Sequence, residues 1–373
     1  MRRLNVNNEE VGLRRTLEEL KEKQSAFQRQ DDQSNLRQVE LAAVEPLAKL
    51  AQLRAHDYDF SEAETFLHAL EQLIYSLNEL AEPKEKLGLE ARLFLTTAIV
   101  NDTWGTYDLF ERMDYVDGAV RLERAEKMYE LTADASSKLG VDKKMVQAMR
   151  GQALRVRGLR LFGLGRYDIE TADTIKAEKE LEEATEVLKQ ASNSLVNAHG
   201  LDARSGMHPA YSHSMAAYAQ GFLFRARADS SAFGGNYKES SELLNGQIKA
   251  FQQAKQPLLS LTGKVAGSMA HRIAQEMDLC EKRQKHFASR PTTQARSPLS
   301  FATILFAVLT VATLFFQLWA STHFGIADRN LIFYVIALTF AILVGGVGAG
   351  LAAWGDATAF FKEILAATQK NDK

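Results

Sequence analysis

The sequence predicts an all-α protein, a helical-hairpin array or bundle followed by two transmembrane helices. Apolar residues recur at helical spacing, as in "LEEATEVLKQASNSL", and no proline interrupts the chain between Pro83 and Pro209. Strand-like runs of β-branched and aromatic residues are absent. Two long segments near the C-terminus carry no charge. Together these observations indicate a helical domain joined to a membrane hairpin.

Charge and turn-forming residues divide the chain into five regions. Residues 1–33 form a charged lead that is helical or flexible, and residues 34–288 form a helical-repeat domain. Residues 289–298 form a basic linker rich in Pro and Ser. The transmembrane hairpin occupies residues 299–354, and an amphipathic tail follows at 355–373.

The hairpin is predicted from two uncharged segments, 299–320 and 331–354, of 22 and 24 residues. At a rise of roughly 1.5 Å per residue, each helix reaches about 33–36 Å, enough to cross a hydrocarbon core of ~30 Å. Five Lys or Arg residues precede the first segment in "EKRQKHFASRPTTQARSP", whereas the connecting loop holds one arginine. The positive-inside tendency therefore places both termini in the cytosol. Which membrane is involved stays open.

Small residues mark one face of the second segment. Gly346 and Gly350 form a G-x-x-x-G pair, with Gly345 and Ala349 beside them. Such a face lets two membrane helices approach closely, either within one hairpin or between copies in a homo-oligomer. Gln317 is the strongly polar residue of the first segment, suited to an interhelical hydrogen bond or to interfacial solvation. The letters "GAGLAA" also fit a dinucleotide fingerprint, but the preceding apolar run is too long for a strand.

The tail after the second segment, "DATAFFKEILAATQK", has apolar residues at i, i+3, i+4, i+7 and i+8. This spacing predicts a short amphipathic helix. It lies in the inner membrane interface or packs on the cytosolic domain, and the sequence favours neither.

Small and large residues alternate through the cytosolic region in a way that suggests repeats. The stretch "GLGRYDIETADTIKAEKELEEATEVLKQA" contains the turn residues Gly165 and Tyr167, and the helix before it carries Gly158. The recurring small positions are Ala63, Ala125, Ala177 and Ser240. This pattern resembles tetratricopeptide-like helical hairpins. The spacings of 62, 52 and 63 residues exceed the family's 34, so a degenerate array or another helical-hairpin bundle is expected.

The resemblance implies that the first helix of each pair lines a concave face that binds a peptide-like partner. Matching by position places Arg155, Tyr218 and Arg225 on this face. Arg160 follows in the same arginine-rich stretch, "LRVRGLR", and these guanidinium groups suit bidentate binding of carboxylates. The alternative is that the arginines are solvated and pair with neighbouring glutamates, as most surface charges do.

No motif predicts catalysis, a cofactor or a metal site. The carboxylates of "HDYDF" and "NDTW" have no nucleophile or phosphate-binding loop nearby, and the spacing of His208 and His213 does not align two metal ligands on a helix. With 45 basic against 47 acidic residues, the chain lacks the charge of a nucleic-acid binder. Cys280 is the only cysteine, and we expect it to be a buried small residue rather than a palmitoylation site.

Two functions fit these predictions. The first is a membrane-anchored scaffold or sensor whose helical array binds a protein partner at the cytosolic face, with membrane lipid around the hairpin. The second is a membrane effector, antiviral or toxin-like, in which the helical domain controls hairpins that make the bilayer leak. The second rests on analogy of architecture alone.

Overall fold

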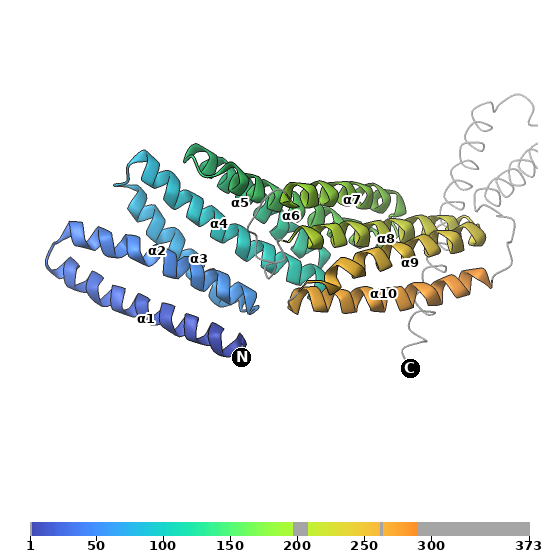
Figure 1. The fold of residues 1–373 in the computed structure, drawn as a ribbon, viewed down its shortest axis with the longest axis horizontal. Coiled ribbons are helices and arrows are strands. Elements are labelled where there is room, and N and C mark those ends of the chain that lie inside the picture. The colour runs from blue at the N-terminus through green and yellow to red at the C-terminus, as the bar shows by residue number, and fades with distance from the viewer. Residues whose placement is uncertain (1, 197–207, 262–263, 290–373) are drawn as a thin grey trace, which may run out of the picture. The chain divides into compact units, whose positions relative to one another are not determined.

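The computed structural model describes residues 2–196, 208–261 and 264–289 (Figure 1). Every element within these ranges is helical, which confirms the all-α class. The predicted hairpin and tail lie outside the described residues, as does the linker from residue 290 onward. The packing roles of Gln317, Gly345, Gly346, Ala349 and Gly350 therefore stay predictions. Among the described helices, none combines the length and the apolar composition that crossing a bilayer requires.

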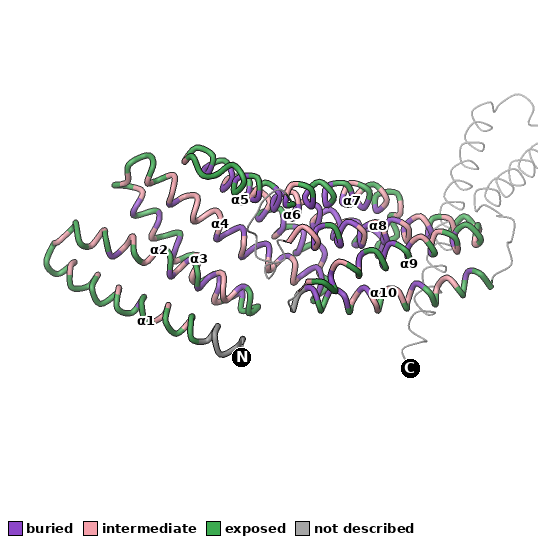
Figure 2. Tube along the Cα trace, viewed as in Figure 1, coloured by how far each residue is buried: buried purple, intermediate pink, exposed green. Residues whose placement is uncertain are grey.

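The described ranges contain ten α-helices and one short π-helical segment, η1. Their bounds are α1 (Arg2–Arg29), α2 (Gln33–His56), α3 (Phe60–Asn78), α4 (Pro83–Tyr107), η1 (Asp108–Arg112), α5 (Tyr115–Lys138), α6 (Lys143–Glu170), α7 (Thr174–Val196), α8 (Pro209–Phe233), α9 (Tyr237–Leu259) and α10 (Lys264–Ala288). The predicted charged lead is thus mainly the helix α1. Figure 2 shows that α1 is largely exposed, whereas α6 is buried along much of its length.

The helices form two compact units. The first contains residues 1–226 and 246–277, and the described part of the second contains residues 227–245 and 278–289. In the first unit, helices that follow one another in the chain pack side by side, including α2 with α3, α4 with α5 and α6 with α7. In the second unit, the Arg283 guanidinium pairs with Asp229 at 2.7 Å. Cys280 is 2% exposed there, which confirms the prediction that it is buried.

The same tight turn precedes α3, α5, α7 and α9, and it also precedes α2, where Asp31 has a φ of 52° and Asp32 caps the helix. One residue of each turn adopts a positive φ. The side chain of the next residue caps the following helix by accepting a hydrogen bond from the backbone N–H three residues further along the chain. The positive-φ residues are Tyr58, Met113, Ala172 and Gly235, with φ of 65°, 57°, 68° and 80°. The capping side chains are those of Asp59, Asp114, Asp173 and Asn236. The four turns before α3, α5, α7 and α9 define the pairs α2–α3, α4–α5, α6–α7 and α8–α9, whereas the turn before α2 has Leu36, a large residue, four positions after its cap.

The turn also corrects the repeat register predicted from the sequence. Four residues after each cap of these four turns, a small residue donates its backbone N–H to the carbonyl of the capping residue; these donors are Ala63, Gly118, Ala177 and Ser240. They are 55, 59 and 63 residues apart, so Gly118 rather than Ala125 is the counterpart of Ala63. Positions 118 and 125 are about two helical turns apart and share one face of α5. For this reason the small-residue pattern alone did not distinguish them.

Small residues bring the paired helices into close contact. A Cβ atom on Gly158 of α6 would lie 2.5 Å from Cγ of Leu188 of α7, and one on Gly165 would lie 2.7 Å from Cγ of Leu181. Ala177 and Ala184 are fully buried on the facing side of α7. The predicted contact between small and large residues is therefore present, and only glycine fits the two α6 positions without displacing a leucine.

Candidate functional site

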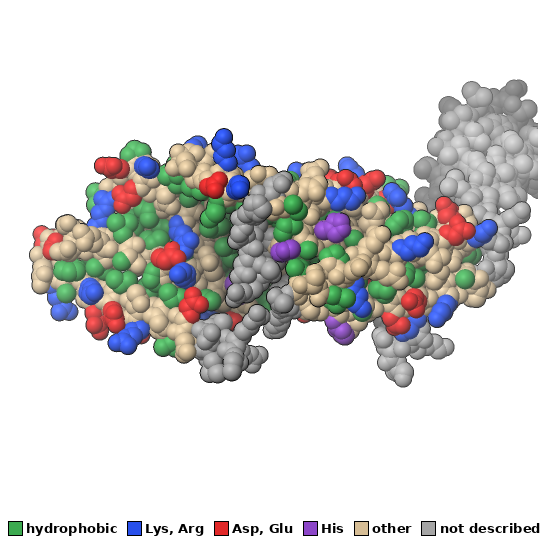
Figure 3. All heavy atoms as spheres, viewed as in Figure 1, with side chains coloured by type: hydrophobic (Ala, Val, Ile, Leu, Met, Phe, Trp, Pro, Cys, Tyr) green, Lys and Arg blue, Asp and Glu red, His purple; other side chains and the backbone are tan. Residues whose placement is uncertain are grey.

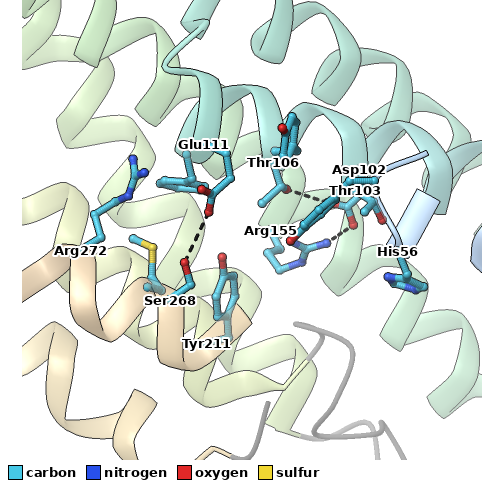
Figure 4. Close-up of a pocket in the computed structure, with 13 residues that line it drawn as sticks. His56, Asp102, Thr103, Thr106, Glu111, Arg155, Tyr211, Ser268 and Arg272 are labelled. Atoms are coloured by element: carbon cyan, nitrogen blue, oxygen red, sulfur yellow. Dashed lines mark hydrogen bonds and ion pairs between the residues drawn. The ribbon is translucent and has the colours of Figure 1, made fainter. Parts of the chain in front are cut away.

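A pocket of about 110 Å³ lies in the first unit, and every pair contributes its first helix to it (Figure 4). Its lining comes from α2, α4, α6 and α8, together with η1, α10 and the turn between α2 and α3. The resemblance assigned partner binding to the first helices of the pairs. The position of this pocket makes it the candidate site.

A buried ion pair forms the floor of the pocket. Arg155 of α6 donates a charged hydrogen bond to Asp102 of α4, and both residues are buried. Asp102 also accepts hydrogen bonds from the Tyr129 hydroxyl at 3.2 Å and the Thr106 hydroxyl at 3.4 Å, while Arg155 Nε donates to Gln152 at 2.7 Å. Burial raises the pKa of Tyr129, and the Asp102 carboxylate raises it further. The floor is thus a pair of opposite charges held by neutral hydroxyl and amide groups.

Tyr211 of α8 adds a second neutral hydroxyl beside the ion pair. The residue is 3% exposed, and Figure 4 shows its ring rising from α8 between Ser268 on one side and Arg155 on the other. Burial raises the pKa of Tyr211 to about 12, with Arg155 opposing the shift and Asp102 adding to it. At neutral pH this hydroxyl therefore stays protonated and can donate a hydrogen bond to a group in the pocket.

The π-helical segment η1 supplies one wall. It continues α4, and the backbone N–H of Asp114 donates to the carbonyl of Asp108, six residues back. Phe110 and Glu111 of this segment line the pocket. The Asp108 carboxylate of the same segment pairs with Arg112 and Arg121, each at 3.1 Å. Burial raises the pKa of Asp108, and the two arginines oppose that shift.

Aromatic residues and a histidine form the rim. The rings of Tyr58 and Tyr107 lie 4.7 Å apart between centroids, at 37° to one another. Tyr58 holds a positive φ of 65°, which is unusual for a bulky side chain. Burial lowers the pKa of His56, while Asp102 and Asp57 oppose the shift. The imidazole is therefore mainly neutral at pH 7.

The lining also carries two charged side chains from different elements, Glu111 of η1 and Arg272 of α10. The Ser268 hydroxyl of α10 donates to the Glu111 carboxylate at 3.4 Å, and Arg272 Nη1 donates to the Met113 sulfur at 3.2 Å. Figure 4 shows Glu111 reaching toward Ser268, with Arg272 beside them. No ion pair joins Glu111 or Arg272 to another charged group within the described residues.

The structure separates the four predicted partner-binding residues. Arg155 lies on the pocket floor. Tyr218 is 1% exposed and packs within 5.0–5.4 Å of the rings of Phe162, Phe222 and Phe251. Arg225 is half-buried, 5.8 Å from the ring of Phe222. In this structure Tyr218 belongs to the core and does not form part of an accessible face.

Arg160 lies elsewhere, on the surface between α5 and α6. It pairs with Glu126 at 3.2 Å, and nearby Arg157 pairs with Glu183 at 2.7 Å. The alternative of arginines paired with neighbouring glutamates therefore describes these two residues. Arg155 differs because its partner is a buried carboxylate on another helix, 53 residues away in the sequence.

Sequence reasoning missed most of the rim. His56, Tyr58, Tyr107 and Glu111 were not predicted as site residues. A signal was present, because "HDYDF" and the stretch "NDTWGTYDLFE" combine aromatic and acidic residues more densely than the rest of the array. These stretches lie about fifty residues apart, and only the packing of α2 against α4 joins them.

The described residues contain no group of three or more His, Cys, Asp or Glu side chains arranged to hold a metal. The buried charges of the pocket are paired with each other rather than directed at a nucleophile. No protein family, curated protein or solved structure matches the chain.

Proposed function

We propose that this chain is a protein-interaction scaffold or sensor whose helical array binds a segment of a partner protein at the pocket. One observation carries the proposal. The π-helical segment η1 and the positive-φ residue Tyr58, two local departures from favourable backbone geometry, meet at one pocket. Backbone departures of this kind cost about 1–3 kcal/mol each and cluster at functional sites.

The comparison of the four turns supports this reading. At the equivalent position before α9 the chain uses Gly235, which adopts a positive φ without strain. Before α3 it uses Tyr58, whose ring lines the pocket. The turns before α5 and α7 place Met113 and Ala172 there, so Tyr58 is distinguished among the four by lining the pocket and not by replacing a glycine. Figure 3 shows acidic and basic side chains interspersed on the visible face, which suits a polypeptide partner better than a nucleic acid.

The sequence supplies the proposed location. The uncharged segments 299–320 and 331–354 would anchor the array in a membrane, surrounded by lipid, with both termini in the cytosol. The small residues around Gly346 and Gly350 would allow copies to associate. The tetratricopeptide-like resemblance, with its partner-binding first helices, agrees with the use of α2, α4, α6 and α8 around the pocket.

Site-specific photo-crosslinking in the full-length chain tests the proposal. A benzophenone amino acid would replace Tyr58 at the pocket or, as a matched control, Tyr75 on α3; these tyrosines are 38% and 74% exposed. We expect position 58 to form an adduct that maps to one segment of one other polypeptide, and position 75 to form none. Equal labelling at both positions, or adducts scattered over many proteins, would contradict the proposal.

The membrane effector is the second candidate, because the predicted hairpin with its small-residue face would suit assembly within a bilayer. Expression of the full-length chain in cells that carry a membrane-potential dye distinguishes the effector from the scaffold. An effector would depolarise the membrane once triggered. Steady potential and normal growth, together with a specific adduct at position 58, would favour the scaffold or sensor.

A further inference from the structure

An aromatic ring and a carboxylate four residues apart hold a cation beside the pocket. Trp104 lies on α4 and Asp108 follows on η1. The Arg121 guanidinium carbon sits 3.2 Å from the centre of the Trp104 ring, and Arg121 Nε donates to Asp108 at 3.1 Å. The ring face and the carboxylate thus bind one guanidinium together, combining a cation–π contact with a charged hydrogen bond.

The same combination recurs three residues further along the chain, at the pocket. Tyr107 is followed four residues later by Glu111, and both side chains line the pocket. The ring of Tyr58 faces Tyr107 at 4.7 Å and adds a second aromatic surface. Glu111 receives only the 3.4 Å hydrogen bond from Ser268, and no lysine or arginine of the described residues pairs with it. This second aromatic–acid pair therefore faces the pocket without a cation from the described chain.

The surrounding charges favour a cation at this rim. Asp102 and Arg155 neutralise each other on the floor, and His56 is mainly neutral. Burial raises the pKa of Tyr58, and the Glu111 carboxylate raises it further. The negative charge of Glu111 therefore acts at that ring. Arg272 is the remaining cation of the lining, and its Nη1 is directed to the Met113 sulfur at 3.2 Å. Glu111 and the two tyrosine rings thus dominate the Tyr107 side of the pocket.

We propose that Tyr58, Tyr107 and Glu111 bind the side chain of a lysine or arginine in the partner segment. The Tyr107 ring would contact its charged group, the Tyr58 ring packed against Tyr107 would extend that aromatic surface, and Glu111 would accept its hydrogen bonds, as Trp104 and Asp108 do for Arg121. This inference rests on the proposed function and adds the chemical class of the group that is recognised. A basic residue in an extended segment reaches such a rim while its backbone stays outside the pocket.

Peptide binding to the purified full-length protein, kept in an uncharged detergent, tests the inference. The probes are acetyl-Gly-Gly-Arg-Gly-Gly-amide and two analogues in which citrulline or glutamate replaces arginine. Citrulline has nearly the shape of arginine but carries no charge. We expect the arginine peptide to bind about tenfold more tightly than the citrulline peptide in calorimetry or nuclear magnetic resonance titration. Equal affinities, tighter binding of the glutamate peptide, or no saturable binding would overturn the inference.

Amino-acid substitutions at the rim test whether the arginine peptide binds there. Glu111→Gln should lower affinity for the arginine peptide about fivefold or more, whereas the control Glu123→Gln, at an exposed acid of α5, should leave it unchanged. Tyr107→Phe keeps the ring face and should retain binding, and Tyr107→Leu removes the face and should lose it. Equal effects of the two glutamate variants, or equal affinities of the two Tyr107 variants, would contradict the assignment.

The crosslinking experiment distinguishes failure of this inference from failure of the proposed function. If the adduct at position 58 maps to a partner segment without lysine or arginine, the scaffold function stands and the basic-residue inference is wrong. If position 58 yields no specific adduct but the arginine peptide still binds through Glu111, the site recognises a free cationic ligand and the scaffold proposal fails.

Discussion

The guanidinium of Arg155 on α6 donates to the carboxylate of Asp102 on α4, and both side chains are buried beneath the pocket. Taking two charges out of water is costly, and their mutual attraction offsets that cost only while both are present. The pair therefore fixes the separation and register of two first helices that share the pocket. It also keeps the pocket floor neutral, so that the rim groups determine which ligands bind.

Removing Asp102 alone should destabilise the protein strongly. Asp102→Ala leaves Arg155 buried without its partner, and we expect a loss of about 3–5 kcal/mol in the free energy of unfolding. The double variant Asp102→Leu, Arg155→Met should recover much of this loss. Asp134→Ala is the control, because Asp134 pairs with Arg150 at 3.6 Å while both are over 60% exposed, and it should cost less than about 1 kcal/mol. Urea unfolding followed by circular dichroism measures all three.

Two glycine-to-alanine substitutions should change the stability of the protein in opposite directions. Gly158→Ala would place a methyl group 2.5 Å from Cγ of Leu188, and overpacking of this kind costs about 1–3 kcal/mol. Gly88 of α4 has no neighbouring atom within 4 Å of an added Cβ, so Gly88→Ala should stabilise the helix by about 0.5–1 kcal/mol. Melting temperatures of the two variants check this. A stabilised Gly158→Ala variant would show that the α6–α7 contact is looser than described.

Glu180 should make stability depend on pH near neutrality. Glu180 of α7 and Asp168 of α6 both approach Lys176, at 3.7 and 3.2 Å. Burial raises the pKa of Glu180 to about 7, and Asp168 raises it further. The folded state therefore binds more protons than the unfolded state between pH 4.5 and 7, and this contribution to stability is lost as the pH rises through 7.

Glu180→Gln tests this dependence because glutamine resembles the protonated acid. Relative to the unmodified protein, we expect the variant to gain unfolding free energy as the pH rises from about 4.5 to 7, and to gain nothing more above that range. The control Glu186→Gln alters an acid of the same helix that is 60% exposed, and it should change the unfolding free energy by less than about 1 kcal/mol. A pH-independent difference for Glu180→Gln would show that the pKa of Glu180 is not raised by folding.

The small-residue face of the second uncharged segment should matter for association. In an α-helix, Gly346 and Gly348 point to nearly opposite sides, so Gly346→Leu and Gly348→Leu form a matched pair. We expect Gly346→Leu to weaken association of the hairpin, seen as loss of chemically crosslinked oligomers in membranes, or as lower stability if the contact lies within one chain. Equal behaviour of the two variants would argue against a specific face.

The single cysteine allows the predicted orientation to be tested by labelling. Cys280 is 2% exposed and should react slowly, so a cysteine introduced by Ser321→Cys in the loop between the two segments would dominate the signal. A membrane-impermeant maleimide should label the Ser321→Cys variant from outside intact cells. A second variant, Ser297→Cys in the linker, should stay unlabelled until the cells are opened. The reverse pattern would invert the predicted topology.

Local sequence patterns determined the helical class and much of the pairing. The spacing of Ala177, Leu181 and Ala184 predicted the buried face of α7, because residues three and four apart share one side of a helix. Gly158 was likewise predicted as a small packing position of the first helix, whereas the prediction that Gly165 and Tyr167 form the turn was wrong, because both lie within α6 and the turn follows Glu170. The two uncharged segments indicated a membrane hairpin from length and composition alone.

The tertiary structure decided which distant residues meet. Arg155 could face solvent, a glutamate on the next helix or a buried carboxylate, and helical periodicity does not distinguish these environments. Its partner Asp102 is 53 residues away, and Tyr58 reaches Tyr107 across a similar separation. Such contacts depend on how α2, α4 and α6 pack as neighbours. Periodicity is a property of one helix, whereas a pocket is a property of several, so the rim emerged only once the helices were assembled.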